Sequence, residues 1–135
     1  MVHIEDGITV TVENRGNSFG DATIRPAFPN MGNAANTRNI SLKFDFSALS
    51  FTPQTVKFKF MDTGGSENIS VNGGARFFGE LASGSSGNVS WEVMAQPQEN
   101  NPHNRFGDVR MTGPVQNLTL GGQEFWVDSV CAEKR

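Results

Sequence analysis

The sequence predicts an all-β protein, folded as a single antiparallel β-sandwich of the jelly-roll type with about nine short strands and no long helix. Two observations predict this fold. Apolar and polar residues alternate with a period of two in several short segments, and clusters rich in Gly, Asn and Ser separate these segments. At 135 residues the chain has the size of one domain. We therefore expect residues 1–135 to form one sandwich domain, either cut from a longer protein or complete as a cytoplasmic protein.

The strongest alternation marks strands at residues 8–12, 40–46 and 56–60. Weaker alternation predicts strands at residues 68–72, 77–81, 88–94, 107–112, 115–120 and 123–131. The glycine clusters DTGGSE (62–67) and GG (121–122) are predicted to be turns between strands. Residues 14–39 form a long predicted connection, in which ATIRPAF (22–28) could be an edge strand interrupted by Pro26.

The polar stretch at residues 95–108 is expected to be a second long loop. Binding residues are often carried by loops that a rigid scaffold positions, so His103, Arg105 and Phe106 are candidate ligand-binding residues. A single histidine in a polar loop is more often a solvated side chain than a functional one, and both interpretations of His103 stay open.

The pattern Asn, apolar, Ser or Thr, apolar occurs four times, beginning at Asn39, Asn68, Asn88 and Asn117. Each copy contains an N-glycosylation sequon. Each copy also follows a polar or turn-like stretch and opens an alternating run, where Asn suits the backbone because it tolerates the left-handed region. The chain has thirteen Asn, so some sequons are expected by chance. We interpret the four copies as strand entries rather than as glycosylation sites.

The aromatic residues are eleven Phe and two Trp, with no Tyr. Phe has no polar group to present at a surface, so this composition indicates rings that fill a core. The predicted centre of that core consists of Phe44, Phe46, Phe58 and Phe60. Trp91 is in register with Val89 and Val93 and is expected to be buried as well.

The composition argues against several classes of partner and site. The net charge is −3 with scattered basic residues, so no nucleic-acid partner is expected. No apolar run reaches the length of about 18 residues that a membrane span needs, and the opening residues do not have the pattern of a signal peptide. The single cysteine, Cys131, cannot form an internal disulfide or a cysteine-based zinc cluster, and its place at a strand end favours a small packing residue.

Common enzyme motifs are absent: the chain has no G-x-S-x-G, no P-loop, no G-x-G-x-x-G and no H-E-x-x-H. A pair of carboxylates could hydrolyse a glycosidic bond. The spacing of the acidic residues selects no pair among Asp45, Asp62, Glu67, Glu80, Glu92 and Asp108. A function without catalysis is therefore favoured.

The last predicted strand carries a candidate sugar-binding residue. In QEFWVDSVC (123–131), Phe125 and Val127 share one face, while Trp126 and Asp128 share the other. If Phe125 faces the core, Trp126 stands beside a carboxylate on the outer face. Flat sugar faces stack on Trp rings, and carboxylates bind the sugar hydroxyl groups. The alternative is that Trp126 packs in a strand covered on both faces.

Three segments carry a resemblance to a known family. They are NISLKFDF (39–46), VKFKFMDTGGSENISVNG (56–73) and GDVRMTGPVQNLTLGGQEFWVDSVC (107–131). Together with the opening GITVTV they resemble bacterial secreted or cell-surface β-sandwich modules, mostly of unassigned function. The closing GGQEFWVD is the most specific of these marks. The resemblance implies an extracellular or cell-surface location.

The final strand is also similar, more distantly, to the last strand of galactose-binding-like jelly rolls, which include bacterial carbohydrate-binding modules. In many of these, a structural calcium links an early Glu or Asp to an Asp on the last strand. That resemblance implies Glu5, Asp6 and Asp128 as calcium ligands. This chain departs from the pattern at Ile4, where the family usually has Phe.

Together these observations favour a non-catalytic carbohydrate-binding, lectin-like module whose partner is a polysaccharide or glycan. Its ligand-binding residues are expected to be Trp126, His103, Arg105 and Phe106. One alternative is a structural or adhesive surface module with no small ligand. The other is a small glycoside-acting hydrolase.

Overall fold

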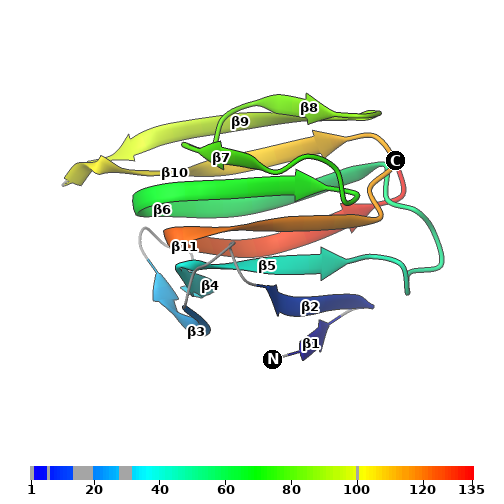
Figure 1. Cartoon of the computed structure of the whole chain (residues 1–135), viewed down its shortest axis with the longest axis horizontal. Coiled ribbons are helices and arrows are strands. Elements are labelled where there is room, and N and C mark those ends of the chain that lie inside the picture. The colour runs from blue at the N-terminus through cyan, green and yellow to red at the C-terminus, as the bar shows by residue number, and fades with distance from the viewer. Residues whose placement is uncertain (1, 6, 14–19, 28–31, 100) are drawn as a thin grey trace.

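The structure is a computed structural model that describes the chain except for residues 1, 6, 14–19, 28–31 and 100 (Figure 1). The described residues form eleven β-strands and no helix. In chain order the strands are β1 (Val2–Glu5), β2 (Ile8–Glu13), β3 (Asp21–Ala27), β4 (Gly32–Arg38), β5 (Ile40–Asp45), β6 (Thr55–Val71), β7 (Phe77–Gly79), β8 (Gly84–Ser86), β9 (Val89–Gln98), β10 (Asn101–Thr112) and β11 (Asn117–Glu133).

The predicted all-β class is confirmed, and the described strands form one antiparallel sheet that curls like half of a barrel. Its main order is β1-β2-β5-β11-β6-β10-β9-β8, with β7 added beside β6, β4 beside β11 and β3 beside β4. Among the described residues, no helix is long and apolar enough to cross a membrane. The strands are more numerous than expected because the chain also forms β1, β3, β4 and β8, while two pairs of predicted strands have merged into the long β6 and β11.

The sheet curls because β6 and β11 bend together and change neighbours at the bend. Residues 117–122 of β11 pair with β5, whereas residues 125–127 pair with β4. In the same way, residues 55–62 of β6 pair with β10 and residues 67–69 pair with β7. Figure 1 shows the two halves of each strand one behind the other, green over turquoise for β6 and orange over red for β11. The core lies between these halves.

The predicted turns at 62–67 and 121–122 are therefore wrong, because both segments lie inside continuous strands at the bend. The glycines in these two segments allow the strands to bend. Gly65 has φ 75°, and a Cβ atom on it would meet the Gln123 side chain. A Cβ atom on Gly121 would overlap the backbone of β5. Shifts of register on both sides of Glu124 complete the corner, as in other sheets whose strands fold over a core.

The interior is one cluster of buried apolar side chains drawn from both halves of the sheet. Its largest fully buried aromatic members are Phe46, Phe58, Phe60 and Phe125. Phe60 and Phe125 stack with ring centroids 5.9 Å apart. Trp91 is also buried, as predicted, and its indole N–H donates a hydrogen bond to the Ala82 carbonyl at 3.0 Å. Burial of these rings is the main favourable term that holds the curled sheet closed.

The Asn patterns are strand entries in three of four copies. Asn39 precedes β5 with φ 58°, Asn88 precedes β9, and Asn117 opens β11. Asn68 differs because it lies inside β6, where it is 2% exposed and accepts a hydrogen bond from the Ser41 hydroxyl at 2.8 Å. A glycan on Asn68 is incompatible with this packing.

Both long predicted loops contain strands. The edge strand suggested at residues 22–28 is confirmed, because β3 contains Pro26 and, among the described strands, pairs only with β4, which was not predicted. Residues 95–108 contain the end of β9 and the start of β10. β4 and these strand ends were missed because their sequences are rich in polar residues and show little apolar alternation.

Cys131 is exposed rather than packed. The reason is a bulge in β11: Ser129 has φ 55°, and the register against β6 shifts between Asp128 and Cys131. The extra residue turns Val130 and Ala132 toward the core and Cys131 away from it.

Replacement of Phe58 by Ala tests which face is the core. Phe58 is 1% exposed, so its removal should cost about 3–5 kcal/mol of unfolding free energy. The matched control is Phe78→Ala, because Phe78 is 63% exposed and its loss should change stability by about 0.5 kcal/mol or less. Urea titrations of the two variants measure the difference. Equal losses would contradict the assignment of the buried face.

Candidate functional site

An apolar strip crosses three neighbouring strands on the face opposite the core. Trp126 of β11 lies opposite Met61 of β6, and Met61 lies opposite Phe106 of β10. Met61 is 4% exposed, and both half-buried aromatic side chains pack against it, separate from the main core. These three residues, here called the outer strip, place two aromatic rings on one side of the sheet.

Polar groups surround the outer strip. Gln96 of β9 is the next residue along the row beyond Phe106 and is exposed. The neighbouring row on the same face contains Asp128, Lys59 and Asp108, aligned across β11, β6 and β10. Cross-strand neighbours of this kind lie about 5 Å apart, so carboxylate, ammonium and amide groups all border the rings.

An exposed methionine extends this apolar surface. Met94 of β9 is 49% exposed and lies opposite Asp108, diagonal to Phe106. Diagonal cross-strand neighbours are within reach of long side chains. At the other end of the row, Asn36 of β4 is buried and donates a hydrogen bond to the Phe125 carbonyl at 3.3 Å, so its amide is already engaged with the sheet.

The expected orientation of the last strand agrees with the structure: Phe125 and Val127 are buried in the core, and Trp126 and Asp128 point the other way. Sequence reasoning did not place Phe106 and Met61 beside Trp126. Phe106 was expected in a loop. It directly precedes the strand predicted at residues 107–112, and in the structure that strand extends back through Phe106 as β10. Met61 was expected on the outer face with Lys57 and Lys59, because it alternates with the core residues of the same strand, but its burial there was not expected.

The other predicted ligand-binding residues are not at the outer strip. Arg105 faces the opposite side of β10 from Phe106, where its guanidinium forms an ion pair with Glu80 at 2.7 Å and donates a hydrogen bond to the Leu81 carbonyl at 3.5 Å. His103 is exposed in β10, beside the register shift between Asn101 and Arg105. The structure therefore separates His103 and Arg105 from the pair Phe106 and Trp126.

A pair of acidic side chains lies at the bend of β6. Asp62 is 7% and Glu67 is 1% exposed, and Asp62 accepts a hydrogen bond from the backbone N–H of Gly64 at 3.0 Å. Burial, followed by the influence of the neighbouring Asp62 carboxyl group, raises the pKa of Glu67 to about 9. A raised pKa favours the neutral, protonated form of Glu67 at neutral pH.

This pair does not have the arrangement of a glycosidase. Both side chains are buried, whereas hydrolysis needs two carboxyl groups that flank a glycosidic bond in an accessible cleft. The nearby positive charge of Arg105 is shared with Glu80. The pair is best explained as two polar side chains that line the bend. A proton on Glu67 removes one of two neighbouring buried negative charges.

The expected calcium ligands are spread across the fold. Glu5 ends β1, and β1 is separated from β11 by β2 and β5. Asp128 lies on β11 opposite Lys59, and Asp6 lies outside the described residues. No group of three His, Cys, Asp or Glu side chains within the described part of the chain is close enough to hold a metal ion. The described residues do not fit a calcium site at Asp128, and calcium binding stays a prediction from the resemblance.

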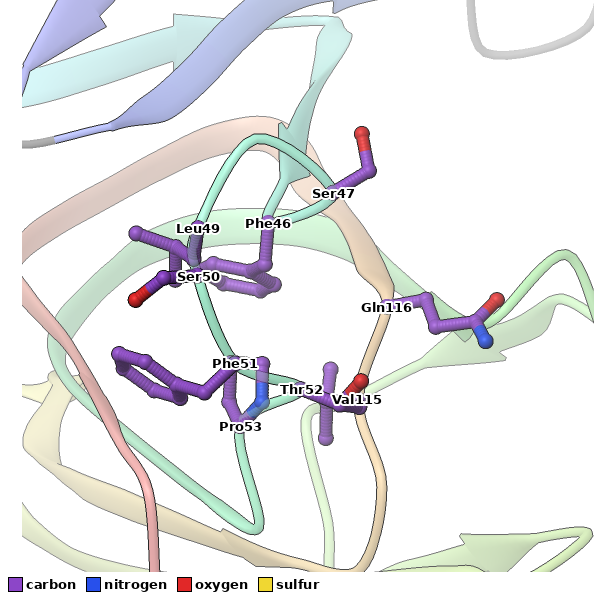
Figure 2. Close-up of a pocket in the computed structure, with 9 residues that line it drawn as sticks. All are labelled: Phe46, Ser47, Leu49, Ser50, Phe51, Thr52, Pro53, Val115 and Gln116. Atoms are coloured by element: carbon purple, nitrogen blue, oxygen red, sulfur yellow. The ribbon is translucent and has the colours of Figure 1, made fainter.

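A pocket of about 310 Å³ lies at the end of β5. Its lining comes from residues 46–53 together with Val115 and Gln116 (Figure 2). Buried Phe46, Pro53 and Val115 form its floor, and in Figure 2 the side chain of Gln116 points away from the loop. None of the predicted site residues lines this pocket, and its one amide side chain is not directed into it.

Comparison of the chain with protein-family models, with curated proteins and with solved structures finds no match. The functional argument therefore depends on the residues themselves.

The raised pKa of Glu67 predicts how the stability of the fold depends on pH. Glu67 has a pKa of about 9 in the folded chain and an ordinary value of 4.5, so between these values the folded chain holds a proton that the unfolded chain has released. The free energy of unfolding should therefore fall as pH rises through this window, by up to about 1.4 kcal/mol per pH unit. Glu67→Gln keeps a neutral side chain and should flatten that slope.

Urea unfolding at about pH 5, 7 and 9 measures the slope. Asp45 and Glu133 have lowered pKa values, because hydrogen bonds from Ser47 and Lys57 respectively favour their charged forms, so their contributions vary only at lower pH. Glu92→Gln, at an exposed position on β9, is the matched control and should keep the slope of the original protein. Identical slopes for the original protein and Glu67→Gln would show that Glu67 is ionised in the fold.

Proposed function

We propose that this chain is a non-catalytic glycan-binding module of a bacterial secreted or surface protein, and that the outer strip is its binding site. The observation that carries the proposal is the alignment of Phe106 and Trp126 on either side of Met61, on the face that the core does not use. The resemblance of the strand segments to bacterial extracellular modules supports the location.

The chemistry of the strip suits a sugar ring. Aromatic rings give sugars a flat apolar surface, against which the C–H groups of a pyranose pack. Around it, Asp108 and Asp128 accept hydrogen bonds from hydroxyl groups, and Lys59 and Gln96 donate them. Because β10, β6 and β11 are paired along their length, these groups are held on a rigid sheet, which lowers the entropy lost on binding.

Two features favour binding over catalysis. The buried acidic pair is on the core side, whereas the aromatic residues are on the outer side, so the two do not share a site. The carboxylates beside the strip, Asp108 and Asp128, lie on strands on either side of β6 and border the rings without converging on a cleft among the described residues.

Trp126→Ala should abolish retardation of the protein in affinity gels that contain the polysaccharide it binds. Loss of one stacking ring is expected to weaken binding about tenfold. A panel of neutral and acidic polysaccharides, run with and without calcium, identifies the ligand class and tests the calcium hypothesis in the same experiment.

Phe78→Ala is the control, because it removes an exposed aromatic side chain from β7, away from the outer strip. It should leave retardation unchanged. Melting curves establish that Trp126→Ala is still folded. Retardation that survives in folded Trp126→Ala would remove the strip as the site, and an absence of retardation on the whole panel would favour a structural or adhesive module.

A further inference from the structure

The two aromatic residues of the outer strip have a defined spacing. Phe106 and Trp126 stand on β10 and β11, which lie on the two sides of β6. Two strand spacings separate their backbones, a distance of about 9.5 Å. Met61 occupies the position midway between them and contacts both. The strip therefore runs across the strands, with an aromatic residue at each end and a thioether in the middle.

This spacing selects a shape of glycan. In an extended β-1,4-linked chain of hexopyranoses, successive rings are turned over, and every second ring presents the same face at a repeat close to two strand spacings. Such a chain is a flat ribbon. An α-1,4-linked chain coils, so its alternate rings cannot lie on one flat row.

Building on the proposed function, we propose that the outer strip binds an uncharged, extended β-1,4-linked glycan chain that lies across β10, β6 and β11. Phe106 and Trp126 contact two sugar units that are separated by one unit, and that middle unit spans the rings, which cover Met61. Three consecutive sugars are the shortest ligand that covers both rings.

The charges beside the strip argue for an uncharged chain. The row next to the outer strip contains two carboxylates, Asp108 and Asp128, and one ammonium group, Lys59. A glycan bound on the strip would lie parallel to this row. The whole chain has a net charge of −3. A uronate or sulfate chain would meet this negative row along its length, whereas neutral hydroxyl groups can donate to the carboxylates.

The test is calorimetric titration with β-1,4-linked oligosaccharides of glucose and of mannose, from one to six units, with maltohexaose as the α-linked control. Affinity for at least one β-1,4-linked series should rise by about tenfold or more between two and three or four units and then level off. Phe106→Ala and Trp126→Ala should each remove that rise. Maltohexaose should bind about tenfold more weakly than the β-linked hexamer.

The outcomes separate this inference from the proposed function. Binding without the step in chain length, stronger binding of maltohexaose, or preference for a polyuronate would overturn the inference while leaving a glycan-binding module. A β-1,3-linked glucan as the sole ligand in the affinity gels would overturn it in the same way. If no polysaccharide retards the protein, the proposed function fails first and this inference fails with it.

Discussion

The fold depends on the joint bend of two long strands. β6 and β11 stay paired with each other from one half of the sheet to the other, so neither strand can bend without its neighbour. Glycines at the bend allow the backbones to approach where side chains would collide, and the Gln123 side chain accepts a hydrogen bond from the Ser66 N–H at 3.0 Å across the corner. Strands β4, β5, β7 and β10 pair directly with this bent pair, and the other described strands pair with those in turn, except for β8 and β1, which pair with β9 and β2 at the ends of the order.

The bend also decides which residues face the core. In β6 the buried apolar positions are even-numbered up to Phe60 and odd-numbered from Ile69 onward, and β11 changes in the same way between Leu120 and Phe125. The same shift therefore decides which residues face outward. Trp126 faces outward because the register moves before Phe125, so the corner that closes the core also builds the outer strip.

Sequence patterns predicted the all-β class, the buried faces of the main strands and the outward direction of Trp126. These features depend on alternation within one strand, which a sequence displays directly. The continuity of β6 and β11 was missed because DTGGSE has the composition of a turn, and composition does not reveal that a neighbouring strand bends at the same level. Phe106 and Met61 were not placed beside Trp126, since cross-strand register is set by partners far away in the chain. The acidic pair was missed for a similar reason, because Asp62 and Glu67 meet only where the strand folds.

The attachment of the β3–β4 hairpin has a consequence for the dynamics of the sheet. β4 meets β11 at three register positions, and the side chains of Asn36 and Thr37 both donate hydrogen bonds to the single carbonyl of Phe125. The hairpin thus has a short anchor compared with strands that pair along their length, which makes it a cooperative unit able to open while the remaining sheet stays intact. Opening would bare the backbone edge of β11 next to Trp126, so the polar groups of that edge would become accessible to water.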